Sequence, residues 1–371
     1  MSGASNFVKY AALGVLVAQN TFLVVFMRIS RSSGAREMYA ASTAVLCMEL
    51  IKFATCLCVI AWESKGVHGL LTSLNTEVIN KPMELVKLGV PSGLYVIQNN
   101  LLYYALSHLD TPTYMIGYQL KILTTALFAT VMLGKKLSRL QWLSLVLLTI
   151  GVSLAQLHAH HTENTASHAK ADAISDHPES PQKESTIAGF VAVLLAACTS
   201  GFSGIYFEKI LKGSKTSLWI RNVQMGLSSI FIALFATFSQ DGDQIREKGF
   251  FYGYNALVCV VVFLQACGGL VVAVVVKYAD NILKGFAASF SIITACIISY
   301  FFLDFQPTML FVCGAVLVLG SSYIYEKGLP PQLGFLRKSV PALFADSTPL
   351  KSKSHDMLPS MVPPKSLKEE V

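Results

Sequence analysis

The sequence has little charge. Only 14% of its 371 residues are Asp, Glu, Lys or Arg, whereas 53% are hydrophobic. A soluble domain carries roughly 25% charged residues, so this deficit argues against a soluble domain and favours a protein that crosses a membrane several times. The net charge of +7 is spread over short polar stretches and forms no continuous basic tract. We therefore do not expect nucleic-acid binding.

Metal and disulfide motifs are also absent. The eight cysteines lie in apolar stretches, without a Cys-x-x-Cys pair or a Cys/His spacing typical of a metal site. We interpret them as small packing residues. Five of the eight histidines are irregularly spaced within residues 158–185, which indicates a flexible polar linker. We expect neither a metal nor another cofactor, and we find no clear cleavage site for a signal peptide.

Long apolar runs dominate what is present. A helix needs about 20 apolar residues to cross the hydrocarbon core of a bilayer, and ten segments satisfy this. The connections are mostly short, apart from the linker and a polar tail at residues 326–371. The predicted fold is all-α and integral to the membrane. The ten predicted spans are residues 8–29, 41–62, 86–107, 112–133, 138–157, 187–209, 217–239, 252–277, 281–303 and 307–325.

Two landmarks recur at nearly the same offset. Asp110 matches Asp280 in its local sequence, and Gly151 matches Gly320. This predicts two five-helix repeats, residues 1–157 and 186–325. Because five is an odd number, the second repeat inserts upside down relative to the first. Inverted repeats are typical of transporters, whose substrate site lies near the midplane at the repeat interface.

Basic residues near the ends of the spans predict the orientation. The loops that contain Lys65, Lys135 and Lys209 carry clusters of lysine and arginine. We therefore expect these loops and both termini to face the cytosol, and the 158–185 linker to lie on the opposite side.

A few ionisable side chains stand inside the spans, where each costs at least about 2.5 kcal/mol. Glu49 and Lys52 are three residues apart on one helix face, which predicts a structural ion pair. Lys121 and Lys284 have no acid within their own spans. One lysine from each half predicts an anionic ligand between the halves, such as a phosphate or pyrophosphate. The alternative is that these lysines extend to the membrane interface.

Polar side chains near Lys121 favour a nucleoside as part of that ligand. Tyr114, Tyr118 and Lys121 follow at i, i+4 and i+7 and share one helical stripe. The tyrosines can stack on a base, and amide side chains can bond base and ribose. The alternative is hydrogen bonding between helices, which membrane bundles also use. The further candidates on these two spans are Tyr95, Gln98, Asn99 and Gln119.

Several longer motifs resemble one protein family. They are Y-Q-L-K-I (118–122), G-F-S-G-I-Y-F-E-K-I-L-K (201–212), W-I-R-N-V-Q (219–224), G-F-F-Y-G-Y-N (249–255) and V-V-V-K-Y-A-D-N-I-L-K-G-F-A (274–287). Over about residues 8–325 the chain resembles the Golgi nucleotide-sugar transporters. The resemblance is to the branch that holds the UDP-galactose, UDP-N-acetylglucosamine and CMP-sialic acid transporters.

This resemblance implies a ten-helix fold of the drug/metabolite transporter type. It also implies exchange of a cytosolic nucleotide sugar for the nucleoside monophosphate left in the lumen. Lys121 and Lys284 fall on the family lysines to which phosphate recognition is ascribed. The other positions that match substrate-contacting residues of the CMP-sialic acid relatives are Asn99, Tyr114, Gly201, Gly204 and Asn222.

Gly226 is a departure from the CMP-sialic acid transporters, which have a tyrosine there. The chain is more similar at this point to the UDP-galactose and UDP-N-acetylglucosamine transporters. We therefore predict an antiporter, not an enzyme, that imports one or both UDP-sugars into the Golgi in exchange for UMP. CMP-sialic acid/CMP exchange is the alternative within the family. An integral-membrane glycosyltransferase, or a scaffold for Golgi glycosyltransferases, is the alternative from another class.

The expected partners are UDP-sugars, UMP and the lipid bilayer, with a homo-oligomer or glycosyltransferases as further possibilities. The Golgi membrane is the expected location, and the endoplasmic reticulum is the alternative. The predicted substrate-binding residues are Lys121, Lys284, Tyr114, Tyr118, Asn99, Tyr95, Gln98, Gln119, Asn222, Gly201, Gly204 and Ser228.

Overall fold

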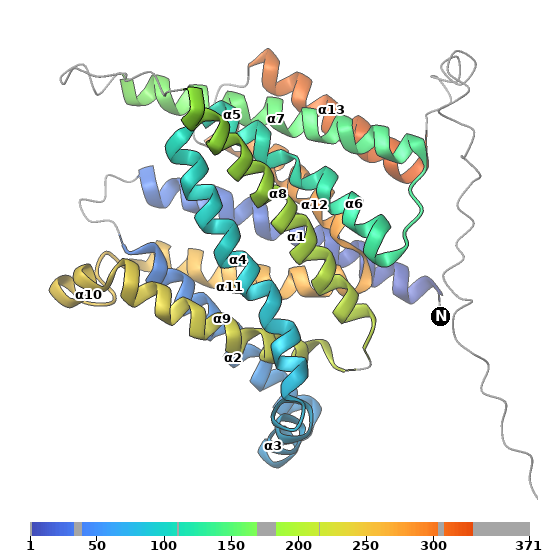
Figure 1. Ribbon diagram of the computed structural model, residues 1–371, viewed down its shortest axis with the longest axis vertical. Helices are drawn as coiled ribbons and strands as arrows, with labels where there is room; N and C mark the ends of the chain where they lie inside the picture. The colour runs from blue at the N-terminus through green and yellow to red at the C-terminus, as the bar shows by residue number, and fades with distance from the viewer. Residues whose placement is uncertain are drawn as a thin grey trace, which may run out of the picture.

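The computed structural model describes residues 2–32, 39–109, 111–168, 183–214, 216–302 and 308–328, which form helices and no strands (Figure 1). The long helices are α1 (Ser2–Ser32), α2 (Ala41–Glu63), α4 (Pro82–His108), α7 (Arg139–His168), α8 (Lys183–Lys212), α9 (Leu218–Gln240), α11 (Ala256–Tyr278), α12 (Asn281–Phe302) and α13 (Met309–Lys327). The shorter helices are α3 (Val67–Leu74), the π-helical turn η1 (Asn75–Ile79), α5 (Thr111–Gln119), α6 (Lys121–Leu133) and α10 (Gly242–Lys248).

Nine membrane-spanning segments can be identified in the described part of the chain, by length and apolar composition. They confirm the prediction of an all-α integral membrane protein. The predicted span at 86–107 lies within α4, which is not among the nine because amide and tyrosine side chains lower its mean hydropathy. With 27 residues, α4 is about 40 Å long and could still cross a bilayer. The count of ten spans stays a prediction.

The predicted linker and tail differ in part from the structure. The helix α7 continues to His168, so the first residues of the 158–185 linker are helical. The next helix, α8, begins at Lys183. Residues 169–182 and 329–371, which include most of the predicted tail, lie outside the described residues.

The most extensive helix contacts all join the two halves of the chain. α7 packs against α13, α4 and α6 pack against α8, α2 packs against α9, and α1 packs against α11 and α12. Figure 1 shows α7 beside α13 at one edge of the bundle and α2 beside α9 near the opposite edge. Side chains of α4, α6 and α8 can therefore contribute to one site between the halves.

Small residues let the backbones of facing helices approach closely, as is common in membrane bundles. A Cβ at Gly201 of α8 would lie 2.6 Å from Thr124 Oγ1 and 2.8 Å from the Thr125 nitrogen, both on α6. Thr124 also donates a hydrogen bond to the Ala197 carbonyl, at 2.8 Å. Gly201 is therefore needed for the packing of α8 against α6.

The predicted span at 112–133 is interrupted in the structure. The helix α5 ends at Gln119 and α6 begins at Lys121, with Leu120 between them. The Leu120 N–H donates to the Gly117 carbonyl at 3.2 Å, which is a tighter i to i−3 turn. The hydroxyls of Thr124 and Thr125 donate to the Lys121 carbonyl at 3.1 and 2.6 Å. Such bonds from Ser and Thr compete with the helix pattern and bend helices.

Glu49 and Lys52 form an ion pair on α2, with 2.7 Å between Lys52 Nζ and Glu49 Oε1. Their side chains are only 10% and 14% exposed, respectively. A Cβ at Gly269 would lie 2.9 Å from Lys52 Cδ. The glycine thus leaves room for the lysine where α2 packs against α11.

Lys52→Met is expected to destabilise the folded protein by about 3 kcal/mol or more, because it leaves the buried Glu49 charge without its partner. The double variant Glu49→Gln with Lys52→Met removes both charges and is expected to be close to neutral. Thermal unfolding in detergent measures both. Equal destabilisation by the single and double variants would contradict a structural ion pair.

Candidate functional site

The junction of α5 and α6 carries a stripe of two tyrosines and a lysine. The ring centroids of Tyr114 and Tyr118 are 6.4 Å apart and the rings are nearly parallel, at 16°. Lys121 Nζ lies 4.1 Å from the centroid of the Tyr118 ring. A cation over an aromatic ring is stabilised by the electrons of the ring face. The positive charge of Lys121 is thus held against a ring.

Two other helices hold Tyr118 in place. Gln98 of α4 is buried and donates from Nε2 to the Tyr118 hydroxyl at 2.9 Å. Ser200 of α8 is a further hydrogen-bond partner of that hydroxyl, and Tyr95 of α4 lies within electrostatic range. Asn99 follows Gln98 on α4 and is partly exposed. The structure therefore brings α4, α5 and α8 together at Tyr118.

Lys284 reaches the same region from α12. Its charge lies within electrostatic range of Lys121, although the two residues are 163 positions apart in the sequence. The helices that carry them, α6 and α12, also pack against each other, so one lysine from each half of the chain faces the same interface. Two cations near each other in an apolar bundle repel, and an anion between them relieves that repulsion. We call the region around Lys121, Lys284 and Tyr118 the lysine site.

Three other predicted residues make contacts within the bundle. Gln119 is buried and donates to Gln156 Oε1 of α7 at 2.6 Å, so its amide is engaged away from the Tyr118–Lys121 stripe. Asn222 of α9 is buried and donates to the Leu218 carbonyl of its own helix at 2.9 Å. Ser228 lies at the contact between α9 and α4. The Asn222 Oδ1 atom is a buried acceptor without a partner in the part of the chain that is described.

The two predicted glycines have packing roles. Gly201 touches α6, as described above. The Gly204 carbonyl accepts a hydrogen bond from Asn281 Nδ2 at 2.6 Å, which joins α8 to the start of α12. Both glycines therefore hold α8 against the helices that carry Lys121 and Lys284.

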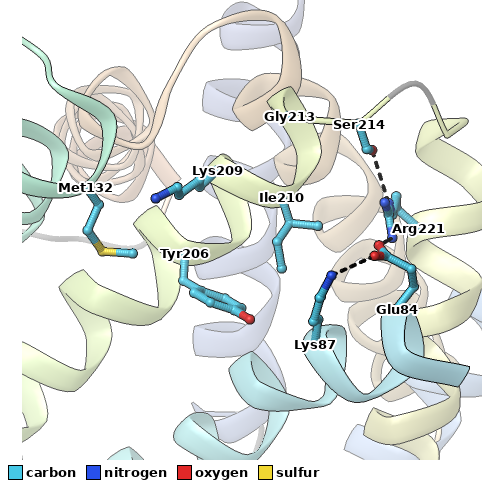
Figure 2. Close-up of a pocket in the computed structure, with 9 residues that line it drawn as sticks. All are labelled: Glu84, Lys87, Met132, Tyr206, Lys209, Ile210, Gly213, Ser214 and Arg221. Atoms are coloured by element: carbon cyan, nitrogen blue, oxygen red, sulfur yellow. Dashed lines mark hydrogen bonds and ion pairs between the residues drawn. The ribbon is translucent and has the colours of Figure 1, made fainter.

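A cavity of about 360 Å³ opens among the ends of α4, α6, α8 and α9 (Figure 2). We call it the end cavity. Its cations are Lys87, Lys209 and Arg221, and its only carboxylate is Glu84. None of the predicted ligand residues lines it, and the sequence gives no signal for it because its lining residues come from separate stretches of the chain. Its other lining residues are Met132, Tyr206, Ile210, Gly213 and Ser214.

Glu84 is shared between two cations of the end cavity. It lies 2.7 Å from Arg221 Nη1 and 2.9 Å from Lys87 Nζ, and Figure 2 shows it between them. The hydrogen bond from Lys87, and then that from Arg221, hold the pKa of Glu84 below its ordinary value. The carboxylate therefore stays ionised at neutral pH, and three cations against one carboxylate give the cavity a net positive charge.

Glu208 is the charged residue that the sequence interpretation missed. It lies in the last turn of the predicted span 187–209 and is fully buried on α8. Its charge acts on Lys284. Its place in a predicted span is a signal that could have singled it out. Across the described ranges, no group of three His, Cys, Asp or Glu residues could hold a metal ion.

The apolar spans, the contacts between the two halves and the paired lysines define a multi-pass membrane carrier of the transporter class. The family model for nucleotide-sugar transporters matches residues 4–326. The chain therefore belongs to the nucleotide-sugar transporter family, which confirms the resemblance and makes it a carrier and not an enzyme.

Several curated proteins are similar to this chain. A UDP-N-acetylglucosamine transporter of Rattus norvegicus is 49% identical over 322 residues, which cover 85% of this chain and 94% of its own. A UDP-N-acetylglucosamine/UDP-N-acetylgalactosamine transporter of Caenorhabditis elegans is 46% identical, over 91% of this chain and 96% of its own length. A UDP-galactose translocator of Bos taurus is 41% identical, over 99% of this chain and 88% of its own length.

The crystal structure of another protein has a similar fold. Its TM-score is 0.58 at 12% sequence identity, over 86% of this chain and 98% of its own length. At this identity the likeness concerns the fold alone.

Arg221→Met is expected to destabilise the protein by about 3 kcal/mol, because it removes a buried charge that bonds Glu84 Oε2 and Gln224 Oε1, and leaves Glu84 with Lys87 alone. The matched control Lys87→Met removes the half-exposed lysine that bonds the same carboxylate, and is expected to cost less than about 1 kcal/mol. Thermal unfolding in detergent compares the two. Equal losses would contradict a structural role for the Arg221 pair.

Proposed function

We propose that the protein is an antiporter that imports a UDP-sugar into the Golgi lumen in exchange for UMP. The observation that carries this proposal is the lysine site, where Lys121 lies over the Tyr118 ring and α6 packs against α12, the helix that carries Lys284. The names of the relatives support UDP-N-acetylglucosamine and UDP-galactose as the sugars. Since the first of these relatives is 49% identical and the second 41%, we favour UDP-N-acetylglucosamine.

The ligand charges fit this proposal. A nucleoside monophosphate carries about 1.5 to 2 negative charges at neutral pH, and the pyrophosphate of a UDP-sugar carries a similar charge. Lys121 and Lys284 offer two positive charges to either ligand. Because buried uncompensated charge is costly in a bilayer, the loaded site crosses between its two orientations more easily than the empty one. Exchange, and not one-way transport, follows from this difference.

The base and ribose have polar partners beside the lysines. Tyr114 and Tyr95, near the anchored Tyr118, supply ring faces and hydroxyls. Asn99, which follows Gln98 on α4, supplies a donor and an acceptor. A tyrosine ring can stack on any nucleobase, because every base has a flat aromatic face. We propose that these groups hold the uridine while Lys121 and Lys284 hold the phosphates.

Gly226 supports a UDP-sugar over CMP-sialic acid. A Cβ at this buried position of α9 would lie 3.2 Å from Phe53 Cδ2 on α2. A tyrosine there would displace the Phe53 ring, so this corner of the bundle differs from that of a carrier with tyrosine at the same place.

The orientation and the repeats are part of the same proposal. The basic loops support an orientation with both termini and the end cavity on the cytosolic side. The contacts of α7 with α13 and of α4 with α8 support two interlocking units of inverted topology, with the lysine site between them.

Vesicles that contain the purified protein and are preloaded with UMP are expected to take up UDP-N-acetylglucosamine much faster than empty vesicles, because the occupied site returns more easily. Preloading with CMP is the matched control and should stimulate little. Equal uptake by empty and UMP-loaded vesicles would contradict exchange. Faster uptake of CMP-sialic acid into CMP-loaded vesicles would favour the alternative substrate.

Lys121→Ala and Lys284→Ala are each expected to lower UMP-driven uptake by roughly ten- to a hundredfold, since each removes a charge-assisted hydrogen bond to phosphate. Lys136→Ala, which removes an exposed lysine in the connection after α6, is the matched control and should retain uptake. Size-exclusion profiles establish that the variants fold. Near-native uptake by both site variants would refute phosphate binding by these lysines.

A further inference from the structure

Glu208 is held by two lysines at the end of α8. Its Oε1 atom lies 2.7 Å from Lys212 Nζ and 3.7 Å from Lys135 Nζ. The side chain of Glu208 is fully buried, whereas those of Lys212 and Lys135 are 35% and 28% exposed. A fully buried carboxylate is strongly destabilising unless its partners stay in place. The position of Glu208 therefore depends on these contacts.

The second oxygen of Glu208 is bonded to the start of α12. Asn281 donates to Glu208 Oε2 from its backbone N–H at 2.9 Å and from Nδ2 at 3.1 Å. Lys284 follows Asn281 by three residues and so lies on the same face of α12. The charge of Glu208 acts on Lys284. One carboxylate thus interacts with Lys284 of the lysine site and with two lysines at the helix ends.

Asp280 completes a cluster of charged residues that also contains Glu208, Lys135 and Lys212. Its carboxylate lies 2.7 Å from Lys135 Nζ and accepts a hydrogen bond from the Leu283 N–H at 2.8 Å, which caps α12. Burial alone would raise the pKa of Asp280, but the ion pair with Lys135, the Leu283 N–H and the charge of Lys212 together hold that pKa below its ordinary value. Lys212 also donates to the Ala279 carbonyl at 2.6 Å. The connection between α11 and α12 is therefore tied to both lysines.

Lys135 is the member of the cluster that comes from the first half of the chain. Gly134 ends α6 in a left-handed conformation with φ 66°, which glycine adopts without strain. The Lys135 N–H then donates back to the Ala129 carbonyl at 3.2 Å. This turn directs Lys135 onto Glu208 and Asp280, both from the second half. The ion pairs therefore close the ends of α6, α8 and α12 against one another.

We propose that Glu208 is a positioning residue that couples occupation of the lysine site to closure of the helix ends at Lys135 and Lys212. The inference rests on the proposed function. In the absence of a ligand, Lys284 attracts the Glu208 carboxylate toward α12, in competition with Lys135 and Lys212. A phosphate bound at Lys284 supplies that lysine with its own counter-ion. The carboxylate then stays against Lys135 and Lys212, and the closed end is stabilised.

This coupling makes the ligand act differently on two states of the carrier, which any ligand-driven conformational change requires. By reciprocity, closure at Glu208 strengthens the hold on the ligand. A carrier that exchanges one anion for another gains from such a link, because the end facing one compartment closes only around a loaded site.

Amide hydrogen exchange of the connection at residues 134–138 tests the proposal in the native full-length protein, with and without UMP. UMP is expected to slow exchange there roughly three- to tenfold in the native protein, the range that one additional screened charge interaction provides. Glu208→Gln keeps the size and the acceptor for Asn281 but loses the charge. It is expected to show no UMP-dependent slowing there, while UMP still raises its Tm. Glu208→Asp keeps the charge and is expected to retain the slowing.

Lys135→Met provides a second variant that does not alter the buried carboxylate. It is expected to lose the UMP-dependent slowing, whereas Lys136→Met, the adjacent exposed lysine, is expected to behave as the native protein does. Native-like slowing in Glu208→Gln or in Lys135→Met would overturn the inference. A native protein that exchanges UMP for UDP-sugar without any slowing at 134–138 would overturn the inference alone. A native protein that neither binds nor exchanges UMP would overturn the proposed function together with it.

Discussion

The bundle depends on how it accommodates positive charge inside an apolar environment. A lysine there needs a counter-ion, an aromatic face or a ligand, because the bilayer offers no water to solvate it. Lys121 lies over the ring of Tyr118, and Lys284 lies within range of Lys121 and Glu208. Lys135 pairs with Glu208 at the helix ends. Each of these lysines therefore has a partner within the protein, and the proposed phosphate would add a further counter-ion at Lys121 and Lys284.

The arrangement of the helices makes these contacts of the lysines possible. The main contacts join the two halves of the chain, so lysines far apart in the sequence meet across one interface. Gly201 allows α8 to approach α6 closely enough for Thr124 to bond the α8 backbone. The break at Leu120 begins a new helix at Lys121. Packing between the halves and the position of the charges are thus parts of one structure.

Much of the fold could be predicted from the sequence because a spanning helix requires little more than apolar length. The stripe of Tyr114, Tyr118 and Lys121 could also be predicted, since residues at helical spacing share a face even across a short break. The direction of Gln119 could not, because Gln156 on another helix decides it. Glu208 was overlooked because a charge at the end of a span resembles an ordinary residue of the membrane interface.

The sequence by itself determined the membrane-embedded helical class, the family and the two lysines that favour an anion. Each of these depends on local composition, helical spacing or a continuous motif. Only the tertiary structure decided which polar groups meet. It placed Gln98 on the Tyr118 hydroxyl and brought the Glu208 carboxylate into contact with residues from three separate segments. It also formed the end cavity from four helix ends. Such contacts depend on how helices from both halves pack, and no single stretch of sequence encodes that packing.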